Sequence, residues 1–378
     1  MIIFFLIVFT VYFLANGYLY YKGYNVIQAG RARVLYTILF VVLASLFTIG
    51  RILERNHSGV ITDIINVAGG FWLAYMLYAI LLFLISDIVI YLIRLYGNTS
   101  PQQIEAALFR RYLAVNLTTF VIVVAGFINA LTPVIKSYDI YIDKELDGRD
   151  ELVIAAVSDL HLGSTIRKRS MKKLQRLISK TDPDIVLFLG DILDGETGPV
   201  LRDDLLAYFD CYNCSDGVWG VAGNHEYIGG IENTVPYIES HGITILSDSV
   251  VVTSSGVNLI GRKDNDSFRY TGNRRTALED LTGRADMTAP VILMDHQPLD
   301  TDQAAARGVD LMLSGHTHNG QIWPISYLVS AIYEKSYGYY RIDNTHIIVT
   351  SGYGLWGPMV RIGSRPEIVR IVLRTKEP

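Results

Sequence analysis

Short apolar runs in the C-terminal two thirds of the chain end in residues that bind metal ions. These runs occupy residues 152–158, 184–189, 218–222, 291–294 and 309–314 and consist mainly of valine, isoleucine, leucine and alanine. Runs this short and this apolar predict β-strands that are buried on both faces. Open α/β sheets place their sites beside the C-terminal ends of such strands. The pattern therefore predicts an α/β fold with one polar site at the edge of its sheets.

The residues that follow these strands offer carboxylate, amide and imidazole groups. So many donors exceed the need of one tetrahedral ion and suit two metal ions that share a bridging carboxylate. Mixed nitrogen and oxygen donors favour Mn, Fe, Zn or Co over Ca or Mg. A structural zinc site is disfavoured because the only cysteines, Cys211 and Cys214, lie outside the set. The predicted ligands are Asp159, His161, Asp191, Asn224, His296, His316 and His318.

The order and spacing of these blocks resemble the calcineurin-like metallophosphoesterases. The blocks are Asp159-x-His161, Gly190-Asp191, Gly223-Asn224-His225-Glu226, His296 and Gly315-His316-Thr317-His318. The resemblance spans roughly residues 150–374. It implies two facing mixed sheets flanked by helices, and hydrolysis of a phosphomonoester, a phosphodiester or a pyrophosphate.

Two longer motifs resemble one branch of that family. Gly315–Gln321 and Gly354–Pro358 are similar to the bacterial YkuE-like proteins, and the attached apolar region is similar to the transmembrane metallophosphoesterases. The resemblance also implies individual roles. It assigns Asp159, His161 and His318 to one metal, Asn224, His296 and His316 to the other, Asp191 to the bridge, and His225 to proton donation.

In that family scheme a hydroxide that bridges the metals attacks phosphorus in line, while the leaving oxygen takes a proton. Other residues near the ligands have open roles. Asp194 and Asp295 are either partners that orient metal-binding histidines or ordinary loop carboxylates. Arg361 either reaches a substrate phosphate or lies on a strand surface. Glu226 is interpreted as structural.

An apolar, aromatic segment follows the double histidine at residues 322–333. It is either a packed core segment or a lip that contacts the bilayer and receives an acyl or prenyl chain, since Trp and Tyr favour such interfaces. Trp323 and Trp356 are therefore further candidates for substrate contact.

The first third of the chain contains long apolar stretches, and a spanning helix needs about 20 such residues. We predict a transmembrane region at residues 1–133 with four spans, a linker and first strand at residues 134–150, and the catalytic domain at residues 151–378. The expected spans are residues 2–21, 34–49, 67–93 and 113–131.

The positions of basic residues predict the orientation of these spans. The loops at residues 22–33 and 94–112 carry more Lys and Arg than the other loops, which places them in the cytoplasm and the catalytic domain on the extracytoplasmic side. Asp87, the one acidic residue inside an apolar stretch, is expected to form an ion pair near the cytoplasmic interface rather than a proton relay.

The expected partners are the lipid bilayer and a lipid or lipid-linked phosphate. The net charge of −4 and the lack of a basic block disfavour nucleic-acid binding. Two alternatives remain open: a sensor or transporter bundle that the phosphoesterase domain regulates, and a non-catalytic metal-binding scaffold. Few polar groups in the apolar stretches disfavour transport, and His225 disfavours the scaffold. The oligomeric state and the pairing of the two cysteines are not predicted.

Overall fold

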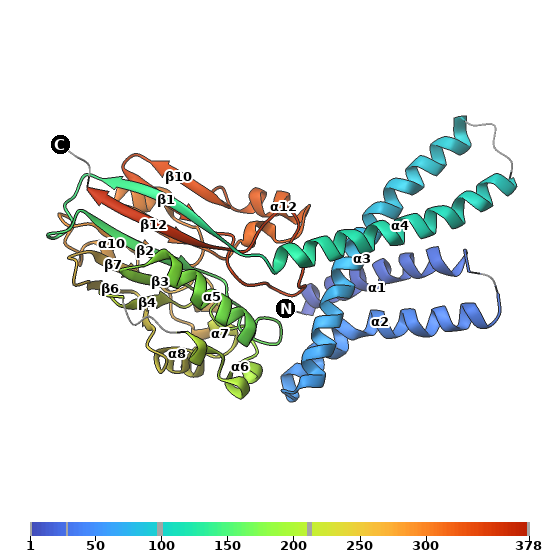
Figure 1. The fold of residues 1–378 in the computed structure, drawn as a ribbon, viewed down its shortest axis with the longest axis horizontal. Helices are drawn as coiled ribbons and strands as arrows, with labels where there is room; N and C mark the ends of the chain where they lie inside the picture. Colours follow the sequence, from blue (N-terminus) through green and yellow to red (C-terminus); the bar gives the residue numbers. More distant parts are fainter. Residues whose placement is uncertain (1, 28, 97–100, 210–213, 376–378) are drawn as a thin grey trace. The chain divides into compact units, whose positions relative to one another are not determined.

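The computed structural model describes residues 2–27, 29–96, 101–209 and 214–375. The chain divides into two compact units (Figure 1). The helical unit contains Met1–Ile128 and the short segment Gly357–Val360. The sheet unit contains Asn129–Trp356 and Arg361–Pro378.

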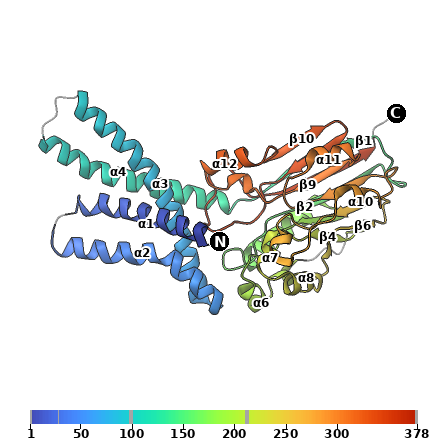
Figure 2. The same ribbon diagram turned by 180° about the vertical axis from the view of Figure 1, so that it is seen from behind.

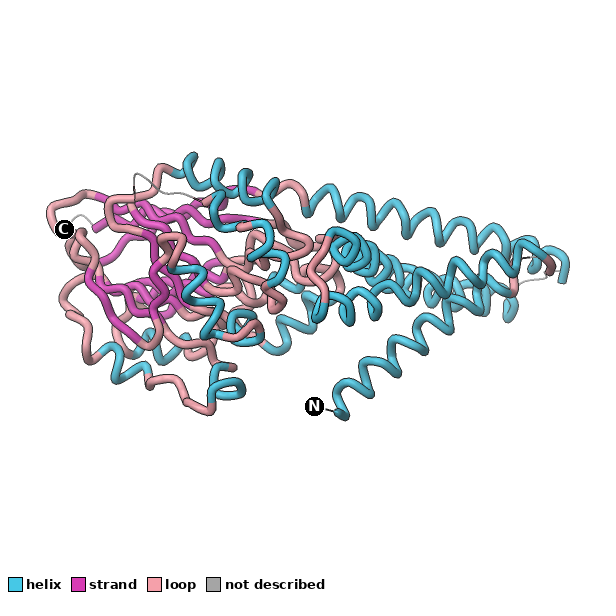
Figure 3. The backbone as a smooth tube through the Cα atoms, turned by 90° about the horizontal axis from the view of Figure 1, so that it is seen from below, coloured by secondary structure: helices cyan, strands magenta, loops and turns pink. Residues whose placement is uncertain are grey.

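Long helices make up the helical unit, and strands are confined to the sheet unit in the described part of the chain (Figure 3). Adjacent glycines in the third helix permit close packing on two sides. A Cβ at Gly69 would lie 2.6 Å from the Cα of Phe47, and a Cβ at Gly70 would lie 3.2 Å from the Cα of Pro358. The helices are α1 (Ile2–Tyr24), α2 (Arg31–Asn56), α3 (Val60–Tyr96) and α4 (Pro101–Ala130).

Three of the four predicted membrane spans are supported within the described residues. Three helical segments there are long and apolar enough to cross a membrane, namely Arg31–Glu54, Val60–Tyr96 and Ala106–Ala130. The first apolar stretch forms the helix α1, whose second half carries Asn16, Gly17, several tyrosines and Lys22. The side chains of residues 2–5 lie outside the described part of the chain, so the span at residues 2–21 stays a prediction.

The sheet unit contains two mixed sheets. The first has the strand order β1-β12-β2-β3-β4-β5, and the second has the order β10-β11-β9-β8-β7-β6. The strands are β1 (Val134–Ile142), β2 (Glu151–Val157), β3 (Ile185–Leu189), β4 (Val218–Val221), β5 (Thr244–Leu246), β6 (Ser249–Val252), β7 (Asn258–Gly261), β8 (Val291–Met294), β9 (Leu311–Ser314), β10 (Gly338–Ile342), β11 (Thr345–Val349) and β12 (Glu367–Thr375).

The main hydrophobic core contains side chains from both sheets. Ile154 and Leu187 from the first sheet and Ile292 and Leu313 from the second are fully buried members of this core. Parallel pairing aligns β2 with β3 and β3 with β4, and likewise β8 with β9. The C-terminal ends of the aligned strands therefore lie together in each sheet, as the apolar runs predict.

Helices cover the outer faces of the sheets (Figure 2). In α5 the buried residues Met171, Leu174 and Ile178 recur at helical spacing, so the helix packs one apolar face against the first sheet. The helical segments of this unit are α5 (Lys168–Thr181), α6 (Gly198–Asp203), η1 (Leu205–Tyr208), α7 (Asn224–Ile228), α8 (Ile231–Glu239), α9 (Ser267–Thr271), α10 (Leu278–Thr282), α11 (Thr301–Ala306), η2 (His318–Gly320) and α12 (Ile325–Ile332).

The predicted linker forms more regular structure than expected. The sequence pattern placed a first strand at Tyr138–Ile142, whereas β1 begins at Val134 and pairs with β12 in parallel along its whole length. Cys214 is disulfide-bonded, and Cys211 lies outside the described residues.

Candidate metal centre

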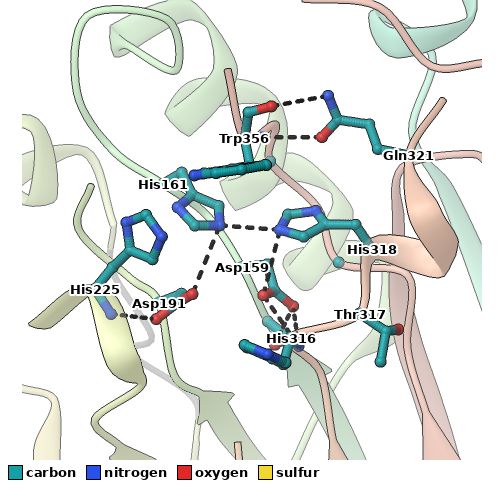
Figure 4. A network of polar contacts seen from close by, with 12 residues as sticks. Asp159, His161, Asp191, His225, His316, Thr317, His318, Gln321 and Trp356 are labelled. Carbon is teal, nitrogen blue, oxygen red and sulfur yellow. Dashed lines mark hydrogen bonds and ion pairs between the residues drawn. The ribbon is translucent and has the colours of Figure 1, made fainter. Parts of the chain in front are cut away.

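The polar residues predicted from the sequence follow the C-terminal ends of β2, β3, β4, β8 and β9. Several of them have a left-handed backbone, which is uncommon for residues other than glycine and concentrates at functional sites. The φ angles are 54° at Asp159, 46° at His161, 51° at Asp191, 67° at His316 and 49° at His318. Sharp turns at these positions direct consecutive side chains toward a common centre (Figure 4).

The first group of donors contains Asp159, His161 and His318, whose ligand atoms all lie within 4.8 Å of one another. The Nε2 atoms of His161 and His318 are 3.0 Å apart, and His318 Nε2 is 3.5 Å from Asp159 Oδ1. Asp159 is fully buried, and the backbone N–H of His316 donates to its carboxylate at 3.1 Å.

The second group contains Asp191, His296 and His316. His296 Nε2 lies 3.2 Å from Asp191 Oδ2 and 3.2 Å from His316 Nδ1. Asp191 also belongs to a third group with His161 and His225, and its Oδ2 is 3.7 Å from His161 Nε2. Asp191 therefore lies between the first two groups, which is the place of a bridging carboxylate.

The chemistry of these donors fits divalent cations. Burial lowers the pKa of His316 to about 3. Burial also lowers the pKa of His318 well below its ordinary value, and the nearby His161 and Arg361 lower it further. Both imidazoles are therefore neutral at pH 7, the form that binds a metal. The Nδ1–H of His296 donates to the Leu189 carbonyl at 2.7 Å. Although burial lowers the pKa of His296, the charges of Asp191 and Asp159 raise it well above its ordinary value, so a metal ion at Nε2 would displace a proton.

Asn224 is the first residue of α7 and directly precedes His225. Its Oδ1 is buried and has no hydrogen-bond partner among the described residues. A buried acceptor without a partner costs about 1–3 kcal/mol, so such an atom is usually satisfied by a group that binds there. A cation at the second group would satisfy it.

His225 is held by Asp194, a carboxylate whose role the sequence left open. Its Nδ1–H donates to Asp194 Oδ1 at 2.9 Å, and its backbone N–H donates to Asp191 Oδ1 at 2.9 Å. Although burial lowers the pKa of His225, the negative charges of Asp191 and Asp194 raise it to about 9. His225 therefore carries a proton at pH 7 beside the donor groups.

Asp295 has a different environment from Asp194. It is fully buried and accepts from Arg262 at 2.9 Å and from Arg275 at 3.0 Å, and both arginines also contact Asp300. These contacts make Asp295 part of an ion-pair cluster that anchors the strand end before His296.

Glu226 connects two of the loops that carry the ligands. Its buried carboxylate accepts the backbone N–H of Asp191 at 3.0 Å, of Leu193 at 2.8 Å and of Gly223 at 2.7 Å. Burial and the charge of Asp191 raise the pKa of Glu226 to about 7. The structural interpretation from the sequence agrees with these contacts, but it did not include the link between the loops.

The guanidinium of Arg361 lies in the interior rather than in an open site. Its Nη2 donates to the carbonyls of Ser351 at 2.8 Å and Gly354 at 2.7 Å and lies 3.4 Å from His318 Nδ1. These contacts favour a positioning role for Arg361 behind His318 over a contact with substrate phosphate.

Gln321 was not singled out from the sequence, although it ends the Gly315–Gln321 motif. Its side-chain amide donates to the Trp356 carbonyl at 3.0 Å and accepts the Trp356 N–H at 2.9 Å (Figure 4). This pair of hydrogen bonds joins the loop of the double histidine to the loop of Trp356. The indole side chains of Trp356 and Trp323 are 59% and 46% exposed.

Comparison with known proteins agrees with this geometry. The model of the calcineurin-like phosphoesterase family matches residues 152–320. A transmembrane protein with a metallophosphoesterase domain from Danio rerio is 28% identical over 74% of this chain and 66% of its own length. The chain thus spans about two thirds of that relative.

Two bacterial relatives each match about three fifths of the sequence. An uncharacterized metallophosphoesterase from Aquifex aeolicus is 30% identical over 64% of this chain and 92% of its own length. The uncharacterized metallophosphoesterase YkuE from Bacillus subtilis is 26% identical over 60% of this chain and 81% of its own length. The donor groups around the Asp191 carboxylate agree with these matches. The chain therefore belongs to the calcineurin-like phosphoesterase family.

Proposed function

We propose that the chain is a membrane-bound phosphoesterase that works with two divalent metal ions and hydrolyses a phosphate ester or a pyrophosphate. The observation that carries the proposal is a set of donor groups in which Asp191 lies close both to His296 and His316 and to His161 and His225. Asp159, His161 and His318 would hold one ion, and Asn224, His296 and His316 the other. Manganese is the metal we favour, with Fe, Zn and Co as the other ions that suit these donors.

Bound divalent ions would neutralise phosphate oxygens and generate the hydroxide that attacks phosphorus. The protein supplies the proton for the leaving oxygen. His225 is protonated at neutral pH because Asp191 and Asp194 stabilise its cation, and Asp194 fixes the orientation of its ring through Nδ1. Nearby cations would lower the pKa of His225 toward neutrality, where general acids act most efficiently.

A lipid or lipid-linked phosphate is the substrate class that we favour. The support is α12, which follows the double histidine and exposes a row of apolar side chains. Tyr327, Leu328 and Ile332 are 70%, 62% and 65% exposed, and α12 buries none of its residues. The Tyr333 ring that ends this segment lies 5.6 Å from the His316 ring, centre to centre. Apolar surface this close to a donor residue suits a substrate with a hydrocarbon chain.

We place the sheet unit on the extracytoplasmic side. Arg94 near the end of α3 and Arg110 and Arg111 in α4 flank the connection between these two candidate spans. Basic residues concentrate on the cytoplasmic side of membrane proteins. The opposite end of α4, which leads into β1, would then face outward.

Activity and metal content of one variant test the chemistry. The purified full-length chain, loaded with Mn²⁺, should hydrolyse an aryl phosphate or an aryl phosphodiester. His225→Ala should retain two ions per chain by elemental analysis and lose at least about 100-fold in kcat, the lower bound for general acid catalysis.

His241→Ala is the matched control. His241 also pairs with an aspartate, Asp204 at 2.8 Å, but belongs to none of the donor groups. Its removal should leave kcat unchanged. Absence of turnover with any of the four metals would overturn the enzyme proposal, and full activity of His225→Ala would remove His225 from the mechanism.

A further inference from the structure

A charged cluster lies inside the helical unit where α1, α3 and α4 meet. The Asp87 carboxylate accepts from Lys22 Nζ at 2.5 and 2.7 Å, from Arg111 Nη1 at 2.6 Å and from Tyr18 Oη at 2.7 Å. The side chains of Lys22 and Arg111 are only 13% exposed. The expected ion pair of Asp87 is present, but it joins two cations to one anion.

The surplus positive charge is not compensated by other described residues. A cavity of about 700 Å³ is lined by Lys22, Arg111 and the exposed Arg94, and Asp87 is the one acidic residue among the described residues that line it. The Nε atom of Arg111 is buried without a hydrogen-bond partner in the described part of the chain. Unpaired charge between apolar helices is costly, so this cavity is suited to an anion.

A second cavity in the same unit is almost entirely apolar. It has a volume of about 810 Å³ and is lined by aromatic and aliphatic side chains from all four helices, among them Leu19, Phe40, Trp72, Phe83 and Phe120. This volume lies within the range of about 300–1,000 Å³ that is typical of ligand pockets.

The two cavities follow one another along the helices. Leu19 and Phe83 line the apolar cavity, and the residues one helical turn later, Lys22 and Asp87, line the charged one. The Arg111 guanidinium lies 5.8 Å from the centre of the Phe83 ring. An apolar space therefore adjoins a cationic space within a single helical unit.

We propose that this pair of cavities binds an anionic phospholipid of the bilayer, with its phosphate at Lys22, Arg94 and Arg111 and an acyl chain in the apolar cavity. Free phosphate would leave the apolar cavity unused. A zwitterionic lipid would add no net negative charge to balance the cations. Basic pockets between membrane helices recognise anionic headgroups in this way. The site consists of helical-unit residues and is independent of the proposed hydrolysis.

Native mass spectrometry of the full-length chain in a neutral detergent tests the site. Phosphatidylglycerol should bind at one molecule per chain and at least tenfold more tightly than phosphatidylcholine with the same acyl chains. Lys22→Gln and Arg111→Gln should each weaken phosphatidylglycerol binding about fivefold, the factor that corresponds to about 1 kcal/mol per cation.

Two further variants separate lipid binding from loss of structure. Arg31→Gln removes a positive charge at the start of α2, outside both cavities, and should leave binding unchanged. Asp87→Asn removes the competing carboxylate and should strengthen phosphatidylglycerol binding, whereas damage to the fold would weaken it.

Equal binding of the two lipids, or unchanged binding by Lys22→Gln, would overturn the proposal. Displacement of phosphatidylglycerol by an equal concentration of inorganic phosphate would also overturn it, because it would show a simple anion site.

Discussion

Asp191 is the residue on which the arrangement of the centre depends most. Its carboxylate faces His161 on one side and His296 on the other and also accepts the backbone N–H of His225. A Cβ at Gly223 would lie 2.2 Å from Asp191 Oδ1, so only glycine permits this approach between the loops after β3 and β4. A Cβ at Gly190 would instead lie 2.5 Å from His296 Nδ1, so the glycines of the Gly-Asp and Gly-Asn-His blocks have different steric causes.

The residues that we propose as ligands could be selected from the sequence because each closely follows an apolar run. The neighbours of those ligands were less predictable. Asp194 and Asp295 both adjoin site residues, yet Asp194 contacts His225 while Asp295 contacts Arg262 and Arg275. The arginines come from the loop after β7, and no local pattern specifies that they reach Asp295. Long-range packing decides between the two roles.

Asp194→Asn should shift the pH dependence of hydrolysis. The proton-donating form of His225 exists below its folded pKa and is lost as pH rises through that pKa. The negative charges of Asp191 and Asp194 raise this pKa to about 9 against the effect of burial. Loss of the Asp194 charge should therefore move the basic limb of kcat/KM to lower pH by about 1 unit or more.

The measurement is a pH profile of kcat/KM at saturating Mn²⁺. Asp204→Asn changes the aspartate that pairs with His241 and is the control that should leave the profile in place. An unshifted basic limb in Asp194→Asn would mean that a group other than His225 controls it.

At the scale of the elements, strands were more predictable than helices. The run at residues 152–158 corresponds closely to β2, and the run at residues 309–314 contains β9, because buried parallel strands need continuous apolar sequence. The first expected span, at residues 2–21, stays a prediction because the side chains at its start lie outside the described residues. For the segment after the double histidine, both a core and a surface interpretation were open, since apolar residues alone do not reveal which face is covered.

Substitutions in α12 should separate lipid substrates from soluble ones. Leu328→Ser and Tyr327→Ser remove exposed apolar surface without opening a cavity, because both side chains are mostly in solvent. We expect kcat/KM for a phospholipid or lipid-linked phosphate to fall about tenfold, which corresponds to about 1.4 kcal/mol of lost apolar contact. Turnover of an aryl phosphate should stay within about twofold.

Val252→Ser is the control for this comparison. Val252 is 64% exposed on β6, where the chain has no predicted site residue. Its replacement should affect neither substrate. If the α12 variants reduce turnover of both substrates equally, α12 supports the fold of the site and does not receive a hydrocarbon chain.

At the scale of the whole molecule, the sequence predicted the division into an apolar helical part and an α/β part. The predicted boundary at residue 133 lies close to the structural boundary at Ile128 and Asn129. Assignment of Gly357–Val360 to the helical unit was not predictable. It depends on the packing of Pro358 against Gly70, two residues that are far apart in the sequence and have no shared local pattern.

Metal binding should stabilise one unit and leave the other unchanged. The proposed ligands come from loops after five strands, all of them in the sheet unit. Binding to the folded state alone stabilises that state by about 2.7 kcal/mol at a metal concentration 100 times the dissociation constant. Addition of Mn²⁺ to the chelator-treated protein should therefore slow amide hydrogen exchange at residues 159–163, 191–195 and 316–321.

Amide hydrogen exchange in α2 should not change when Mn²⁺ is added, because none of the proposed ligands lies in the helical unit. Asp191→Asn should abolish most of the protection, since the carboxylate that we assign to the bridge between the two ions is lost. His225→Ala should retain it, since His225 is assigned to proton transfer and not to metal binding. Protection confined to residues 159–163 and 316–321 would show that only the first ion binds, and the two-ion scheme would be wrong.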